Sequence, residues 1–179
     1  MSLWVFLAYS FFGFLLELAY ARLTKSKKPD RKCLLALPLC PVYGLAALGI
    51  LALPPVVTRT PWLLFLCGGA VAVAVEYAMG FFTRYALGVD FWDYSELKGN
   101  VDGLVCPLFA VFWGLLAVVG RTYLHPLVAP VLEALPGWLG AAAAAALGTD
   151  VVISALLLRR RRDTGCLRWY DRLKIFQVP

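Results

Sequence analysis

Two glutamates, Glu17 and Glu76, lie inside long apolar stretches of the sequence. Because an ionised side chain is costly in lipid, such residues are rare in membrane helices and usually bind ions, protons or substrates. We therefore predict that the two carboxylates bind a proton, a small cation or a polar substrate. The alternative is structural: each carboxylate would pair with tyrosine, arginine or backbone N–H groups and hold helices together.

Each glutamate is followed by a Cys-Pro pair at the start of the next apolar stretch. Residues 40–44 read Cys-Pro-Val-Tyr-Gly, and residues 106–110 read Cys-Pro-Leu-Phe-Ala. The order Glu, Cys, Pro therefore occurs twice, which indicates a duplicated two-helix unit. Paired segments that proline interrupts in the two halves of a transporter point to its binding site.

Cys40 and Cys106 have two possible roles. Each would stand at the N-terminus of a helix if Pro41 and Pro107 begin helices, and that position favours a thiolate that acts as ligand or nucleophile. The alternative is a small buried packing residue. If Pro41 begins a helix, that helix would be short, from about 41 to 53, and residues 34–39 would approach the membrane in a non-helical form that protein must shelter. Otherwise both prolines merely kink longer helices. His125 is the only histidine, which argues against a Cys-His mechanism and against haem or imidazole-dependent zinc sites. We predict no cofactor and no metal.

The elements that carry these residues are expected to be transmembrane helices. Hydrophobic residues make up 61% of the 179-residue chain and the mean hydropathy is +0.76, which leaves little sequence for a soluble domain. Since about 20 apolar residues cross a bilayer core, we predict an all-α membrane protein with about five transmembrane helices. The predicted spans are residues 2–23, 34–53, 62–86, 104–123 and 137–158.

These spans are expected to form one transmembrane domain over residues 1–158, with repeat units at about 2–53 and 62–123. Residues 159–179 would form a basic cytoplasmic tail, which could lie as a short helix in the headgroup plane. The first span lacks a basic start and contains Glu17, so we expect a retained helix and not a signal peptide.

The basic residues predict the orientation of the helices. Lysine and arginine crowd the first loop, and Arg159, Arg160, Arg161 and Arg162 follow the last helix. The positive-inside rule places both regions in the cytoplasm, with the N-terminus outside, and the two repeat units then run in parallel. We therefore expect a multi-pass protein of the inner or plasma membrane. The net charge of +6 reports this topology and predicts no nucleic-acid partner. The four arginines would contact lipid phosphates as a secondary effect.

Small and polar residues recur at steps of three and four in three of the predicted helices, so that each set lies on one helical face. Small residues let neighbouring helices approach closely, and we expect these faces to point toward protein. The sets are Ser10, Gly13, Glu17, Tyr20 and Thr24; Gly69, Ala72, Glu76, Gly80 and Thr83; and Gly140, Ala143, Leu147, Asp150 and Ser154.

Residues 88–103 are expected to form a polar and aromatic loop at the cytoplasmic face. Its polar side chains would either cap helix ends and form local turns or recognise a polar headgroup or a partner protein. Tyr43, Tyr77 and Trp113 are expected to pack between helices. The full set of candidate binding residues is Glu17, Tyr20, Cys40, Tyr43, Glu76, Tyr77, Asp93, Tyr94, Ser95, Asn100 and Cys106. No catalytic residue is assigned.

Several segments of the chain resemble one known family. They are Gly13-Phe-Leu-Leu-Glu17, Cys40-Pro-Val-Tyr-Gly44, Glu76-Tyr77, Trp92-Asp93-Tyr94-Ser95 followed by Asn100, Gly103 and Cys106, and Phe112-Trp113-Gly114. Over roughly residues 10–118 the chain is similar to the CmpB-type ABC-transporter permease family of small bacterial polytopic membrane proteins. The resemblance implies a membrane location and a role in transport. The chain departs from the family pattern before Cys40, where Leu37-Pro38 stands in place of the expected Gly-Pro.

The first functional hypothesis is a transport-related membrane subunit, in which Glu17 and Glu76 line one polar pocket that loop 88–103 seals. The sequence has no Gly-x-x-x-x-Gly-Lys-Ser/Thr loop, so an ABC role would require a separate ATPase subunit. So few helices also favour a homo-oligomer or heteromer. A second hypothesis is a membrane-embedded enzyme that acts on lipid or a hydrophobic metabolite, with a glutamate as acid or base. A third is a regulatory or assembly subunit with structural acids.

Overall fold

The computed structural model describes residues 2–24 and 32–168, and this part of the chain is helical without strands. Four helical segments are long and apolar enough to cross a membrane. They are α1 (Ser2–Leu23); Pro61–Leu87, which comprises α4 (Pro61–Leu63), η1 (Leu64–Gly68), α5 (Gly69–Phe82) and η2 (Thr83–Leu87); Pro107–Glu133, which comprises α6 (Pro107–Val119), η3 (Gly120–Leu124) and α7 (His125–Glu133); and α8 (Gly137–Arg161). The all-α membrane class predicted from the sequence is confirmed.

The second predicted span has the shorter of the two forms expected for it. Residues 34–40 are not helical, and α2 covers only Pro41–Leu51. At about 1.5 Å per residue this helix rises about 16 Å, which is roughly half the thickness of a bilayer core. A crossing at this place would therefore consist of a short helix and a non-helical segment. The total number of crossings stays a prediction.

Proline explains where α2 and α6 begin. Pro41 and Pro107 each occupy the first turn of a helix, and Cys40 and Cys106 before them have extended backbone conformations. The ring fixes a helical φ and lacks an N–H that the first turn would leave unpaired. Of the two alternatives, the structure therefore has helix starts and not kinks. Neither cysteine side chain makes a capping hydrogen bond.

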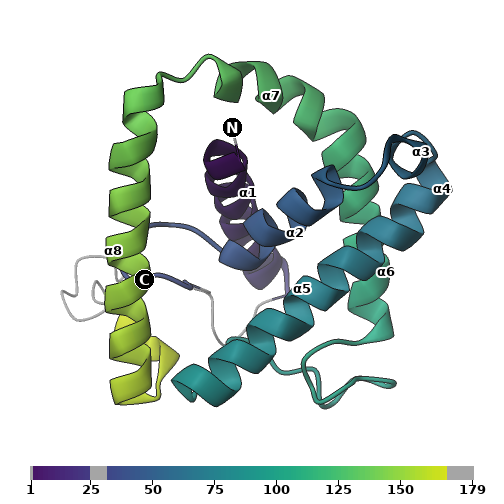
Figure 1. The fold of residues 1–179 in the computed structure, drawn as a ribbon. Helices are drawn as coiled ribbons and strands as arrows, with labels where there is room; N and C mark the ends of the chain where they lie inside the picture. The colour runs from purple at the N-terminus through teal and green to yellow at the C-terminus, as the bar shows by residue number, and fades with distance from the viewer. Residues whose placement is uncertain (1, 25–31, 169–179) are drawn as a thin grey trace.

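The fourth predicted helix continues beyond residue 123. After η3 the chain enters α7, and Figure 1 shows α7 running across one end of the molecule toward the start of α8. α3 (Pro55–Thr58) lies in the connection between α2 and α4, and η4 (Thr164–Leu167) follows α8. Beyond Arg168 the predicted tail helix lies outside the described residues, as do residues 25–31 of the basic first loop.

Small residues bring neighbouring helices together as the sequence pattern predicts. Gly44 of α2 lies directly against Ser10 of α1, and Gly13 of α1 lies against the ring of Tyr43. Every member of the Gly69-to-Thr83 set is buried, whereas in α1 burial decreases toward Tyr20 and Thr24. In α8 only Asp150 and Ser154 of the predicted set are buried, so this helix contacts the rest of the protein mainly through its C-terminal half.

Loops that are predicted to lie on the same side of the membrane lie at the same end of the molecule. At one end a cluster of apolar residues joins the segment before α2, the end of η2 and the end of α8; its members include Leu35, Leu87, Val89, Leu158 and Leu167. At the other end Arg59 and Arg121, from the α2–α4 connection and from η3, line one pocket. Which end faces the cytoplasm stays a prediction.

The buried carboxylate of Asp150 holds the non-helical segment before α2. Its two oxygens accept hydrogen bonds from the backbone N–H groups of Leu35 (3.1 Å), Ala36 (3.1 Å) and Leu37 (2.7 Å). Ser154 accepts from Leu35 N–H (2.8 Å) and donates to Asp150 (3.2 Å). Asp150 lies near the middle of α8, where lipid could not supply these partners. Figure 1 shows the segment passing α8 before it enters α2.

We expect Asp150→Ala to lower the free energy of unfolding by about 3 kcal/mol, because it leaves buried backbone N–H groups without their charged acceptor. Unfolding in mixed detergent micelles would measure the effect. Glu133→Ala, which removes an exposed carboxylate at the end of α7, is the matched control and should change the value by less than about 0.5 kcal/mol. Equal effects of the two substitutions would contradict the capping role.

Candidate functional site

Glu17 of α1 and Glu76 of α5 line the same cavity, which we call the glutamate cavity. It has a volume of about 310 Å³ and is enclosed by α1, α2, α5, α6 and residues 91–94 of the loop after η2. Among residues 2–24 and 32–168, no lysine, arginine or histidine contributes to its lining. Two carboxylates thus share a space whose described lining is largely apolar.

Glu17 is held by a tyrosine of the neighbouring helix. The Tyr43 hydroxyl donates a 2.8 Å hydrogen bond to Glu17 Oε1. The Tyr43 ring lies between Gly13, which has no side chain to obstruct it, and the indole of Trp113, with ring centroids 4.9 Å apart. Glu17 itself is half-buried, so it lies at the less enclosed side of the cavity.

Glu76 is more deeply buried, with 4% of its surface exposed. The Tyr94 hydroxyl donates to Oε1 over 3.0 Å. Trp113 lies close to the carboxyl group, but no described donor reaches Oε2 with hydrogen-bond geometry. Glu76 Oε2 is therefore a buried acceptor without a hydrogen-bond partner among the described residues.

The tyrosine partners of the two glutamates come from different places in the chain. Phe109 occupies the position in the second Cys-Pro segment that Tyr43 occupies in the first, and it has no hydroxyl. The Tyr94 ring stacks on Phe109, with centroids 4.5 Å apart and planes at 14°, and its hydroxyl reaches Glu76. The loop thus supplies the donor that α6 lacks.

Aromatic rings form most of the remaining wall. They are Tyr20, Tyr43, Phe91, Trp92, Tyr94, Phe109, Phe112 and Trp113. Tyr20 is at the rim, with 38% of its surface exposed. The predicted binding set included Tyr20, Tyr43 and Tyr94 but not the other five aromatic residues. The alignment of Phe109 with Tyr43 was the signal that could have found Phe109.

The two Cys-Pro cysteines lie in different environments. Cys40 lines the cavity, and its Sγ is 3.3 Å from Sγ of Cys33, which also lines it. Cys106 is buried before α6 and does not reach the cavity. The Cys33–Cys40 pair is not joined in a disulfide. Within residues 2–24 and 32–168, no group of three or more His, Cys, Asp or Glu side chains is arranged to hold a metal.

The polar residues of the loop build its conformation and do not line the cavity. The Asn100 amide donates to the carbonyls of Ser95 (3.1 Å) and Leu97 (2.8 Å) and accepts from Gly103 N–H (3.0 Å). The Ser95 N–H donates to Asp93 Oδ1 (2.9 Å), and this bond holds the pKa of the Asp93 carboxyl below its usual range. These contacts match the alternative in which the polar side chains of the loop form local turns.

The same turn places the aromatic residues of the loop. Tyr94 N–H donates to the carbonyl of Gly103 (2.8 Å), whose φ of 69° suits a residue without a side chain. Trp92 Nε1 donates to the carbonyl of Leu104 (2.8 Å), and the Trp92 ring packs over Gly80 of α5. Loop residues predicted to bind ligand therefore act by positioning Tyr94 and Trp92 at the cavity.

Tyr77 and the C-terminal arginines lie away from the cavity. Tyr77 was expected between helices, but its hydroxyl donates to Asp102 Oδ2 (2.7 Å) at an exposed position and its ring stacks on Phe81. Arg84 joins the same surface network by donating to the carbonyl of Asp102 (2.6 Å), and it also pairs with Asp90 (2.7 Å). Arg159, Arg160, Arg161 and Arg162 are exposed at the end of α8, where they are free to meet lipid phosphates.

Comparison with protein-family models gives one match. Residues 4–157 match the model of the family described as "Putative ABC-transporter type IV". The chain belongs to this family. It is accordingly a transport-related, multi-pass membrane protein, as the resemblance over residues 10–118 implied. No curated protein and no solved structure matches the chain significantly.

We expect Asn100→Asp to loosen the loop that carries Tyr94, because a carboxylate cannot donate the two hydrogen bonds that the amide makes. Amide hydrogen exchange should accelerate across residues 94–105, and alkylation of Cys40 from the cavity should become faster. Glu96→Gln, an exposed change in the same loop, is the control. Unchanged exchange in the Asn100 variant would show that the amide does not hold the loop.

Proposed function

We propose that this chain is a membrane subunit of a transporter and that the glutamate cavity binds a small cationic substrate. The observation that supports the proposal is that two carboxylates line one cavity whose other described lining residues are mostly apolar and aromatic. A proton or an inorganic cation would also neutralise these carboxylates. The aromatic wall favours an organic cation, because aromatic faces attract ammonium groups most strongly where water is excluded.

Each glutamate has a distinct part in this proposal. Glu76 is buried and its Oε2 has no hydrogen-bond partner among the described residues, so it is the principal counter-charge for the ligand. Glu17 is half-buried and bonded to Tyr43, which places it nearer to an entrance. A cation entering past Glu17 would meet the second carboxylate deeper in the cavity, and the summed negative charge would favour its entry.

The energy source is proposed to be a separate ATPase subunit. Family membership supports this partner, and the sequence has no phosphate-binding loop of its own. The short α2 and the partly unpartnered α8 also support assembly with further copies or with another subunit, because a complete transport path requires more enclosed surface than one chain offers.

The direct test is calorimetric titration of the purified protein with tetraethylammonium, with 3-ethyl-3-pentanol as an uncharged probe of similar size and with sodium. We expect tetraethylammonium to bind and the alcohol to bind at least tenfold more weakly. Glu76→Gln should weaken the binding of tetraethylammonium at least tenfold, which corresponds to about 1.4 kcal/mol, and Glu17→Gln should weaken it less.

Glu133→Gln removes an acid at the other end of the molecule and is the control for net charge. Equal affinity of the wild-type protein and a folded Glu17→Gln, Glu76→Gln double variant would contradict the proposal. If both variants fold and associate normally and no cation binds to the wild-type protein, the glutamates are structural and the chain is a regulatory or assembly subunit.

A further inference from the structure

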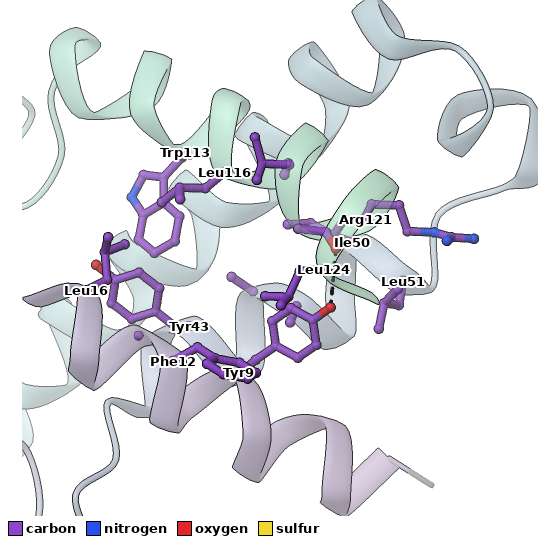
Figure 2. A pocket seen from close by; sticks show the side chains of 16 residues that line it. Tyr9, Phe12, Leu16, Tyr43, Ile50, Leu51, Trp113, Leu116, Arg121 and Leu124 are labelled. Atoms are coloured by element: carbon purple, nitrogen blue, oxygen red, sulfur yellow. Dashed lines mark hydrogen bonds between the residues drawn. The ribbon is translucent and has the colours of Figure 1, made fainter. Parts of the chain in front are cut away.

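A second cavity lies on the other side of Tyr43 and Trp113 from the glutamates, and we call it the apolar cavity. Its volume is about 210 Å³, and residues of α1, α2, α6 and η3 line it. Figure 2 shows apolar and aromatic side chains around it, with Tyr9, Phe12 and Leu16 from one side and Leu116 and Leu124 from another. The Tyr9 hydroxyl is already occupied by the carbonyl of Gly120 at 3.4 Å. Such a space suits a hydrocarbon group far better than water.

A polar pocket adjoins the apolar cavity, and we call it the arginine pocket. Its volume is about 530 Å³, and Arg59, Arg121, Thr58 and Thr122 contribute its polar lining. Arg121 and Leu51 line both spaces, so the two are direct neighbours. In Figure 2 the guanidinium of Arg121 points away from the apolar side chains, which places the charge beyond the apolar cavity.

The charges in the arginine pocket have no partner among the described residues. Neither Arg59 nor Arg121 forms an ion pair with a described carboxylate, and Arg121 Nε is buried without a hydrogen-bond acceptor. His125, one turn further along the same helical segment, also has a buried nitrogen without a partner, Nδ1. A buried donor without an acceptor is costly, and an anionic ligand would supply the acceptor.

The geometry points to a bound anionic phospholipid, and we propose that the apolar cavity holds part of an acyl chain while Arg59 and Arg121 hold the phosphate. The order of the two spaces, apolar and then cationic, matches the order of groups in such a lipid. Guanidinium groups bind phosphate oxygens through paired hydrogen bonds, and the Thr122 hydroxyl adds a donor, whereas the Thr58 hydroxyl donates to the carbonyl of Pro55 (3.4 Å). This site shares neither carboxylate with the glutamate cavity, so it stands or falls separately from the proposed function.

The test is native mass spectrometry of the delipidated protein in a nonionic detergent, titrated with dioleoyl phosphatidylglycerol and, in parallel, with dioleoyl phosphatidylcholine. We expect one phosphatidylglycerol to bind at least tenfold more tightly than phosphatidylcholine. An Arg59→Gln, Arg121→Gln double variant should lose this preference at least tenfold, and thermal unfolding would verify that it is folded.

Two further variants separate the parts of the site. Ala47→Leu should narrow the apolar cavity and weaken phosphatidylglycerol binding while both arginines remain. The Arg159→Gln, Arg160→Gln double variant, changed at the other end of the molecule, should bind the first phosphatidylglycerol as tightly as the wild-type protein does.

The proposal is overturned if the Arg59→Gln, Arg121→Gln variant retains phosphatidylglycerol as the wild-type protein does, or if the Arg159→Gln, Arg160→Gln variant is the one that loses it. Inorganic phosphate provides a last distinction. If millimolar phosphate displaces the lipid completely, the arginines bind a free anion and the acyl chain contributes nothing, which would also overturn the proposal.

Discussion

The arrangement of this protein depends on one requirement: the backbone N–H groups before α2 must find acceptors inside a membrane protein. Lipid offers none, so a non-helical segment at this depth must be sheltered by other parts of the chain. Asp150 and Ser154 on α8 meet the requirement for Leu35, Ala36 and Leu37, and the carbonyl of Ser10 on α1 accepts from Cys40 N–H at 2.9 Å. The segment is thereby fixed between two helices that are distant in the sequence.

The position of the glutamates follows from this attachment. Because Cys40 is fixed against α1, α2 begins at Pro41 and Tyr43 falls within reach of Glu17. On the other side of the cavity the Asn100 turn fixes Tyr94 against Glu76. Two irregular segments, each held by a polar side chain, therefore place the two carboxylates along one space. Regular helix packing alone would leave the second carboxylate without its tyrosine, since Phe109 has no hydroxyl.

Local patterns predicted much of this structure, and contacts between distant residues account for what they missed. The prolines and small residues indicated where helices begin and which faces pack, because both depend on near neighbours in the chain. The role of Asp150 was not predictable, since it depends on a segment more than 110 residues away. The non-helical form of that segment was one of the two alternatives that Pro41 allowed, but the sequence did not indicate which helix would shelter it. The predicted position of Tyr77 between helices was also wrong, because its partner Asp102 lies in the loop and not on a neighbouring helix.

The central claim is that Glu17 and Glu76 face one cavity, and thiol cross-linking tests it most directly. Cysteines would replace both glutamates in a chain whose five native cysteines are changed to serine or alanine, and a short bis-methanethiosulfonate would be added in membranes. We predict efficient intramolecular cross-linking, and none between cysteines at Leu15 and Phe81, which are exposed on the same two helices. Failure of the 17–76 pair to cross-link, or equal cross-linking of both pairs, would contradict the account.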